Sequence, residues 1–322
     1  MNLKTFVTLI LVTFSFSAFA QDINQAGEIY NQGNEALKAG NYEVALQKYE
    51  ESIKLASTLG VEGEQLVSGA KANIPTCYYQ LGIAAYKKKN YDGAMTQMES
   101  SIKYGKEYND LKTVSKAEST IPKLYYSRGL TFYKGKDYSK AIEDFNKAIE
   151  LNPNFAKAYR LIGLSYSEVG EKGKMLESFS TGLEIAEKEG DSETAKKIKS
   201  AAKSRIQKEG TMKLQAQNWD EALPYFNELL KYDPDNKDNF YYLAMANNGL
   251  KNWDEAINSA QKGLSFSSED SDEYKAKFYY ELGNAFKGSG QIDKACEAYK
   301  NASYGDFVTG AEYLIKEDLK CK

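Results

Sequence analysis

A small residue followed twelve positions later by another small residue recurs seven times along the chain. A large side chain, almost always apolar or aromatic, stands four residues before the first member and, in all copies but one, another stands sixteen residues after it. Residues three or four apart share a helix face, so each copy predicts two consecutive helices that pack closely through their small residues. The pairs are Gly33/Ala45, Gly82/Ala94, Gly129/Ala141, Gly163/Met175, Gly210/Ala222, Ala244/Ala256 and Gly283/Ala295, with Met175 the one departure.

The copies are unequally spaced. Gly129 to Gly163 and Gly210 to Ala244 span 34 residues each, whereas the other intervals run from 39 to 49. The additional sequence, for example residues 191–208, is rich in Ala, Lys, Glu and Ser and contains no internal turn cluster. It predicts longer helices, by about two turns each, rather than flexible linkers.

An Ile-Pro pair precedes a Tyr-Tyr pair at two of the extended joints, at Pro75 and Pro122. The two prolines are 47 residues apart, the same as the glycine interval, which indicates an internal duplication of copies two and three. A proline inside a helix frees a carbonyl group and bends the axis, so a kink at each joint is expected. A helix that begins at each proline is the alternative.

The repeated pattern resembles the tetratricopeptide repeat, most clearly in the third copy, which has Tyr125, Gly129, Phe132, Tyr138, Ala141, Phe145, Ala148 and Pro153. The resemblance implies an all-α fold, a right-handed superhelical solenoid of seven helix pairs over residues 21–309, several of them with extended helices. The repeats are expected at about 26–59, 75–108, 122–155, 156–189, 203–236, 237–270 and 276–309. An apolar spacing over 307–320 predicts an amphipathic helix, and we assign 310–322 as a C-terminal capping helix.

Residues 1–20 are expected to be a secretory signal peptide. Lys4 provides a basic start, residues 6–16 are almost wholly apolar or hydroxyl-bearing, and Ala18-Phe19-Ala20 is a small-x-small cleavage site. An uncleaved anchor helix is the alternative. No other apolar run is long enough to span a bilayer, so we expect an exported protein, periplasmic or secreted, with no transmembrane segment in its mature chain.

The composition argues against catalysis. The chain contains no histidine, and its formal net charge is −3. Histidine is the commonest general base and metal ligand, and the three cysteines have no zinc or redox spacing. We therefore expect no enzyme activity, no catalytic residues, no metal site and no cofactor. The acidic balance likewise argues against a nucleic-acid partner.

The cysteines predict one disulfide. Cys296 lies early in the second helix of the last repeat and Cys321 ends the predicted capping helix. If these helices are antiparallel, the two residues face each other about a centre near residues 308–309, close to the turn at 304–307. An oxidising compartment would preserve a Cys296–Cys321 bond, and two buried thiols are the alternative. Cys77, beside the core residue Tyr78, is expected to be a buried free thiol.

A tyrosine-rich surface is the candidate binding site. In the resembled fold the first helices line a concave groove, and a residue adjacent to a core residue is rotated by ~100° towards it. The predicted partner-binding residues lie at these positions or two turns further along: Tyr30, Tyr79, Tyr86, Tyr126, Tyr133, Arg160, Tyr241 and Tyr280. Tyrosine combines a large contact area with a hydrogen-bonding tip. The alternative is that these rings pack against neighbouring helices.

The carboxylate clamp of some family members, which grips peptide C-termini, is not carried over. Asn34 could supply one element, but Tyr30, Tyr79 and Ile83 occupy the neighbouring positions.

The sequence therefore favours a non-catalytic scaffold or adaptor in the cell envelope that captures a peptide segment or helix of another envelope or exported protein. The alternative is an envelope carbohydrate-binding module that uses the same aromatic groove. Tryptophan platforms flanked by Asp or Asn would favour sugar binding. Trp219 and Trp253 instead begin predicted second helices, at a position expected to pack.

Overall fold

The computed structural model describes residues 22–321, which form helices and turns without a strand. The chain divides after Ser165 into two compact units, described separately here. The predicted signal peptide, residues 1–20, lies outside the described residues. Among residues 22–321, every helix is too short or too polar to cross a membrane.

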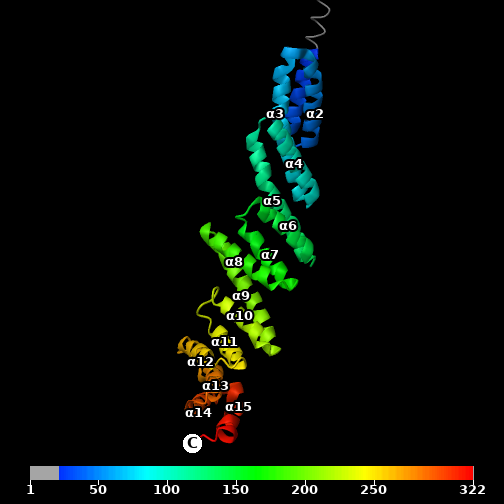
Figure 1. Cartoon of the computed structure of the whole chain (residues 1–322). Helices are drawn as coiled ribbons and strands as arrows, with labels where there is room; N and C mark the ends of the chain where they lie inside the picture. The colour runs from blue at the N-terminus through cyan, green and yellow to red at the C-terminus, as the bar shows by residue number, and fades with distance from the viewer. Residues whose placement is uncertain (1–21, 322) are drawn as a thin grey trace, which may run out of the picture. The chain divides into compact units, whose positions relative to one another are not determined.

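Unit 1 consists of consecutive helices that pack mainly on their neighbours in sequence (Figure 1). It opens with a helix over residues 22–38. The elements that follow are α2 (Tyr42–Ala56), the 3-10 segment η1 (Ser57–Gly63), α3 (Glu64–Lys87), α4 (Tyr91–Glu107), α5 (Leu111–Lys134), α6 (Tyr138–Leu151) and α7 (Ala156–Glu168), whose last turn passes into unit 2.

Unit 2 continues the same arrangement and ends in a short C-terminal helix. Its elements are α8 (Lys172–Lys188), α9 (Ser192–Gln215), α10 (Trp219–Leu229), α11 (Lys237–Gly249), α12 (Trp253–Ser265), α13 (Asp272–Gly288), α14 (Ile292–Asn301), η2 (Gly305–Phe307), α15 (Val308–Tyr313) and the π-helical segment η3 (Leu314–Asp318).

The longer repeat intervals lengthen the helices, as predicted. Helices α3, α5 and α9 each have 24 residues, against 13 in α11. Both α5 and α9 begin directly after an aspartate whose carboxylate accepts the N–H three residues later, at 3.1 Å for Asp110 and 3.0 Å for Asp191. These N-caps satisfy amide groups that the first helical turn leaves without a partner.

The prolines lie inside helices, so the alternative that a helix begins at each of them is wrong. Pro75 is within α3 and Pro122 within α5, and each helix starts well before its proline. The preceding residues are good helix formers, and both prolines are buried, so packing along the helix offsets the lost N–H donor. The carbonyl oxygen of Pro75 accepts a buried hydrogen bond from Ser101 Oγ in α4 at 2.9 Å.

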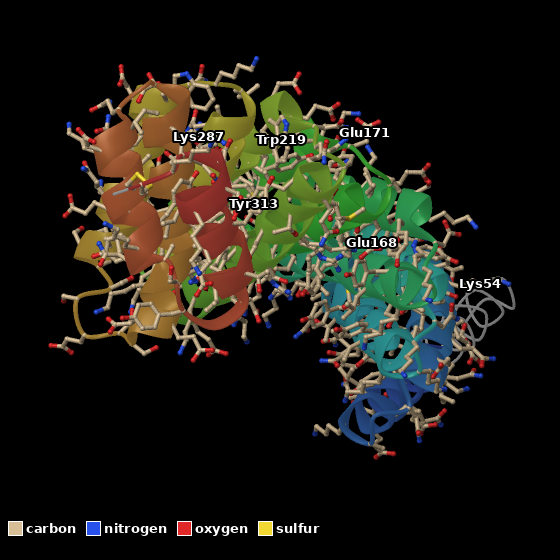
Figure 2. All side chains as sticks on the ribbon, turned by 90° about the horizontal axis from the view of Figure 1, so that it is seen from below. Lys54, Glu168, Glu171, Trp219, Lys287 and Tyr313 are labelled. Atoms are coloured by element: carbon tan, nitrogen blue, oxygen red, sulfur yellow. A yellow bond between two sulfur atoms is a disulfide. The ribbon has the colours of Figure 1, made fainter. Side chains whose placement is uncertain are left out.

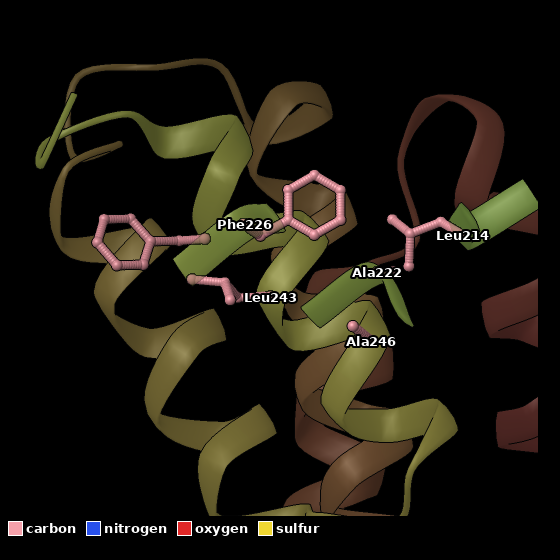
Figure 3. Packing of buried hydrophobic residues seen from close by; sticks show 6 residues of the cluster. Leu214, Ala222, Phe226, Leu243 and Ala246 are labelled. Carbon is pink, nitrogen blue, oxygen red and sulfur yellow. The ribbon is translucent and has the colours of Figure 1, made fainter. Parts of the chain in front are cut away.

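The predicted close contacts between small and bulky residues are present. A Cβ atom added to five of the glycines would come within 3.0 Å of the side chain sixteen residues later: Tyr49 for Gly33, Met98 for Gly82, Phe145 for Gly129, Phe226 for Gly210 and Tyr299 for Gly283. In unit 2, Phe226 packs in a buried cluster with Leu214, Ala222, Phe240, Leu243 and Ala246 (Figure 3). The helix pairs therefore approach each other through backbone that only glycine leaves open.

Where the bulky residue is tyrosine, an asparagine beside the glycine accepts its hydroxyl. Tyr49 donates to Asn34 Oδ1 at 2.8 Å, and Tyr299 donates to Asn284 Oδ1 at 2.9 Å. A buried hydroxyl without such a partner would be costly. Asn34 Oδ1 also accepts from Asn73 Nδ2 of α3 at 3.4 Å, so this oxygen is already engaged within the protein.

The C-terminal helix covers the last repeat as a cap. Ala311 is buried against Tyr299, and Leu314, Ile315 and Leu319 pack on the same cluster. Lys287 of α13 forms an ion pair with Asp318 at the end of the cap. Cys296 and Cys321 form the expected disulfide, with Cα atoms 5.8 Å apart, drawn as the yellow sulfur–sulfur bond in Figure 2. Cys77 is a buried free thiol, as predicted, and burial raises its pKa to about 12.

Candidate functional site

Unit 1 holds five of the predicted tyrosines on the first helices of its repeats. Tyr30, Tyr79, Tyr86, Tyr126 and Tyr133 are all half-buried. Helices α3 and α5 are joined directly at this surface, because Tyr86 Oη and Ser127 Oγ are 3.0 Å apart. This contact links the two helices that carry Tyr79, Tyr86, Tyr126 and Tyr133. We call Tyr79, Tyr86, Tyr126 and Tyr133 the tyrosine face of unit 1.

Each ring of this face is held by contacts with its own repeat or the next one. Tyr79 and Tyr86 pack against the buried cluster around Met95 and Met98. The ring centroids of Tyr126 and Phe155 are 4.9 Å apart, and those of Tyr133 and Tyr138 are 5.6 Å apart. The rings contribute to packing, and their remaining surface is presented in a fixed orientation.

Tyr30 lies at the start of unit 1 and contacts two elements. Its ring centroid is 5.9 Å from that of Tyr49, and its hydroxyl lies beside Gly69 in α3. Arg160 is half-buried in α7.

The other two predicted tyrosines belong to unit 2. Tyr241 lies 6.2 Å from Phe278 and 5.5 Å from Tyr242, measured between ring centroids. Tyr280 lies 5.7 Å from Tyr299 and 5.3 Å from Phe307. Burial raises the pKa of both phenols above the usual range. Aromatic neighbours therefore cover part of the Tyr241 ring and part of the Tyr280 ring.

The tryptophans occupy packing positions, as predicted. A Cβ atom added to Gly249 would lie 2.3 Å from the Trp219 ring, and one added to Gly288 would lie 2.7 Å from the Trp253 ring. Each indole is therefore seated on a glycine of the following repeat. This contact gives both tryptophans a packing role.

The additional turns of the extended helices create a cavity of about 740 Å³ in unit 1. It lies where η1 and the first turns of α3 meet the end of α4, and Val61, Val67, Lys71 and Tyr108 are among its lining residues. Val61 is 81% exposed, and Lys71 Nζ lies 5.2 Å from the centre of the Tyr108 ring. Carboxylates and a lysine are mixed along its wall, so the cavity has no single charge preference.

Sequence analysis missed a buried carboxyl group in unit 2. Glu281 is only 5% exposed and is hydrogen-bonded by Asn248 and Asn284. It stands two residues before Gly283 and three before Asn284, so it shares the inner face of α13. This spacing from Gly283 and Asn284 was the sequence signal that could have identified Glu281 as an inward-facing residue. Within residues 22–321, no group of three or more acidic, cysteine or histidine residues is arranged to hold a metal ion.

Comparison with known proteins gives one consistent result. Models of the tetratricopeptide repeat match residues 30–106, 122–155, 208–270 and 276–304, which together are more than half of the chain. No curated protein matches the sequence.

Several solved structures are similar at low sequence identity. The MamA RS-1 ArsTM double mutant is 14% identical, with 59% of this chain and 95% of that chain covered and a TM-score of 0.35. YrrB, described as a protein of this repeat type with an unusual peptide-binding site, is 18% identical, with 56% and 84% covered and a TM-score of 0.34. The TPR2AB domain of yeast Sti1, in complex with pHSP90, is 17% identical, with 92% and 97% covered and a TM-score of 0.33.

Proposed function

Because the chain belongs to the tetratricopeptide repeat family, whose fold serves protein–protein interaction, we propose that it is a non-catalytic scaffold. The scaffold captures a peptide segment or helix of a partner on the tyrosine face of unit 1. The partner would be another envelope or exported protein.

One observation carries the proposal. The tyrosine face places four half-buried rings on two adjacent helices, and the contact between Tyr86 and Ser127 ties these helices together. Rings already held by Phe155, Tyr138 and the methionine cluster lose little side-chain entropy on binding. The accessible parts of these amphipathic rings can then contact a segment of a partner.

The envelope location rests on the sequence of residues 1–20. Mass spectrometry of the protein from its native host should find Gln21, or its cyclised form, at the N-terminus. A retained Met1 would favour the anchor-helix alternative instead.

The binding face is tested with a partner first identified by photo-crosslinking from a probe placed at Tyr126, and then purified. Tyr79→Ala and Tyr126→Ala should each weaken binding by about 2 kcal/mol or more if the rings are binding hot spots. Tyr304→Ala is the matched control, because Tyr304 is 45% exposed and lies outside the first helices.

Melting temperatures must be measured on the same variants, because the rings also contribute to packing. Full partner affinity in the Tyr79→Ala, Tyr126→Ala double variant, together with an early melting transition, would show that these rings are core residues. The proposed face would then be wrong.

A further inference from the structure

A polar cluster in unit 2 lies apart from the tyrosine face of unit 1. Asn248 Nδ2 of α11 donates to Glu281 Oε2 of α13 at 2.7 Å and to the Glu281 backbone carbonyl at 2.9 Å. Asn284 Nδ2 donates to the same Oε2 at 3.3 Å. Both amide donors thus serve the same oxygen of the carboxyl group, Oε2.

One acceptor in the cluster is left over. Asn248 Oδ1 is buried and has no hydrogen-bond partner within residues 22–321. It belongs to the amide that contacts Glu281, so this acceptor lies beside the carboxyl group. Buried acceptors without donors are unfavourable and rare in folded proteins.

The donors around this cluster are already engaged. The Tyr299 hydroxyl donates to Asn284 Oδ1, Lys277 pairs with Asp238 at 2.5 Å, and Lys287 pairs with Asp318. The cluster therefore has a surplus acceptor, a carboxyl group, and no cation of its own.

The surroundings suit a small cation. Tyr280 is the chain neighbour of Glu281, and burial, followed by the charge of Glu281, raises the pKa of Tyr241 and Tyr280. Asn248, Asn284, Tyr241 and Tyr280 are each partly exposed, whereas Glu281 itself is only 5% exposed. The faces of tyrosine rings attract cations.

We propose that this cluster is a binding subsite for a primary ammonium group, the side chain of a lysine in a partner protein. An ammonium group has three donors and no acceptor, so it can donate to the Glu281 carboxyl group and Asn248 Oδ1 together. Its charge is more compact, and its stem more slender, than the broad guanidinium of arginine, which favours lysine at a recessed carboxyl group. The inference rests on the proposed function in that the lysine belongs to a protein partner.

Binding at this subsite is coupled to proton release. Burial raises the pKa of Glu281, while the hydrogen bonds from Asn248 and Asn284 oppose the rise. The other titratable groups that face Glu281 are Tyr241, Tyr280 and Tyr299, whose pKa values are themselves raised above the usual range, chiefly by burial, so they stay neutral. Affinity should fall tenfold per pH unit below the pKa of Glu281 and reach a plateau above it.

The test uses the full exported chain and two defined probes, n-butylammonium chloride and the peptide acetyl-Ala-Ala-Lys-Ala-Ala-amide. Carbon-13 NMR of the Glu281 carboxyl should show a saturable shift with both, and the peptide should bind more tightly. The same peptide with norleucine in place of lysine should not bind. Glu281→Gln should weaken peptide binding at least tenfold, whereas Glu255→Gln, an exposed glutamate of α12, should not.

Three outcomes would overturn the inference. These are no saturable shift in the wild-type protein, unchanged peptide affinity in Glu281→Gln, or equal affinity for the lysine and norleucine peptides. Equal affinity for n-butylammonium and the lysine peptide would overturn the assignment to a protein lysine. None of these measurements involves the tyrosine face. A negative result for the lysine subsite would therefore leave the proposed binding of a partner on the tyrosine face to be decided by its own test.

Discussion

The indole ring of Trp219 lies directly against Gly249, so that a Cβ atom added to the glycine would come within 2.3 Å of the ring. Trp253 and Gly288 repeat this contact one repeat later. Where the earlier residue is the smaller tyrosine, as at Tyr42 and Tyr91, the position corresponding to the glycine carries Lys87 and Lys134. The size of one aromatic residue thus decides which side chain the following repeat can carry.

Gly249→Ala should destabilise the protein by about 1–3 kcal/mol, because the new methyl group would overlap the rigid Trp219 ring. Urea unfolding measures the effect. Gly173→Ala is the matched control in unit 2: an added Cβ there meets nothing within 4 Å, and alanine is the better helix former, so stability should stay unchanged or rise by up to ~1 kcal/mol. Equal responses of the two variants would contradict the proposed ring contact.

Reduction of Cys296–Cys321 should loosen the C-terminal cap while the other repeats stay folded. The bond encloses a sequence separation of 25 residues, for which the chain-entropy model gives roughly 3 kcal/mol. Repeats depend chiefly on their neighbours, so hydrogen exchange should accelerate mainly in α15 and η3. Thiol counting in denatured, unreduced protein should find one free thiol, that of Cys77, and a count of three would remove the disulfide.

Glu281 should make stability depend on pH. Its pKa is raised in the folded protein by burial. The folded state therefore holds the proton more tightly than the unfolded chain, and this stabilisation is complete below the unfolded pKa of about 4.3 and is lost as pH rises through the folded value.

Glu281→Gln keeps the shape and removes this titration. The variant should be more stable than the wild type by about 1–2 kcal/mol at pH 8, and the difference should shrink towards pH 4, because glutamine carries no charge and can donate to Asn248 Oδ1. Thermal unfolding across this pH range measures it, with Glu255→Gln as the exposed control. A constant difference at every pH would show that Glu281 does not titrate as proposed.

The sequence by itself determined the helical repeats and their unequal lengths, and it predicted the cysteine pairing with two buried thiols as the alternative. Contacts such as Gly129 against Phe145 lie within one repeat, at a fixed spacing, so local periodicity is enough to predict them. The extended helices follow from the absence of turn residues between repeats. The disulfide was predicted on the condition that two neighbouring helices are antiparallel, and the structure contains the bond.

Only the tertiary structure decided which faces meet between repeats. Helices α3 and α5 continue through Pro75 and Pro122 because packing offsets a missing hydrogen bond, which residue type alone does not reveal. The contact of Tyr86 with Ser127 and the burial of Glu281 against Asn248 each join residues of different repeats. Their geometry depends on how successive helix pairs stack, and that stacking is set by the summed packing of many side chains rather than by the spacing within any one repeat.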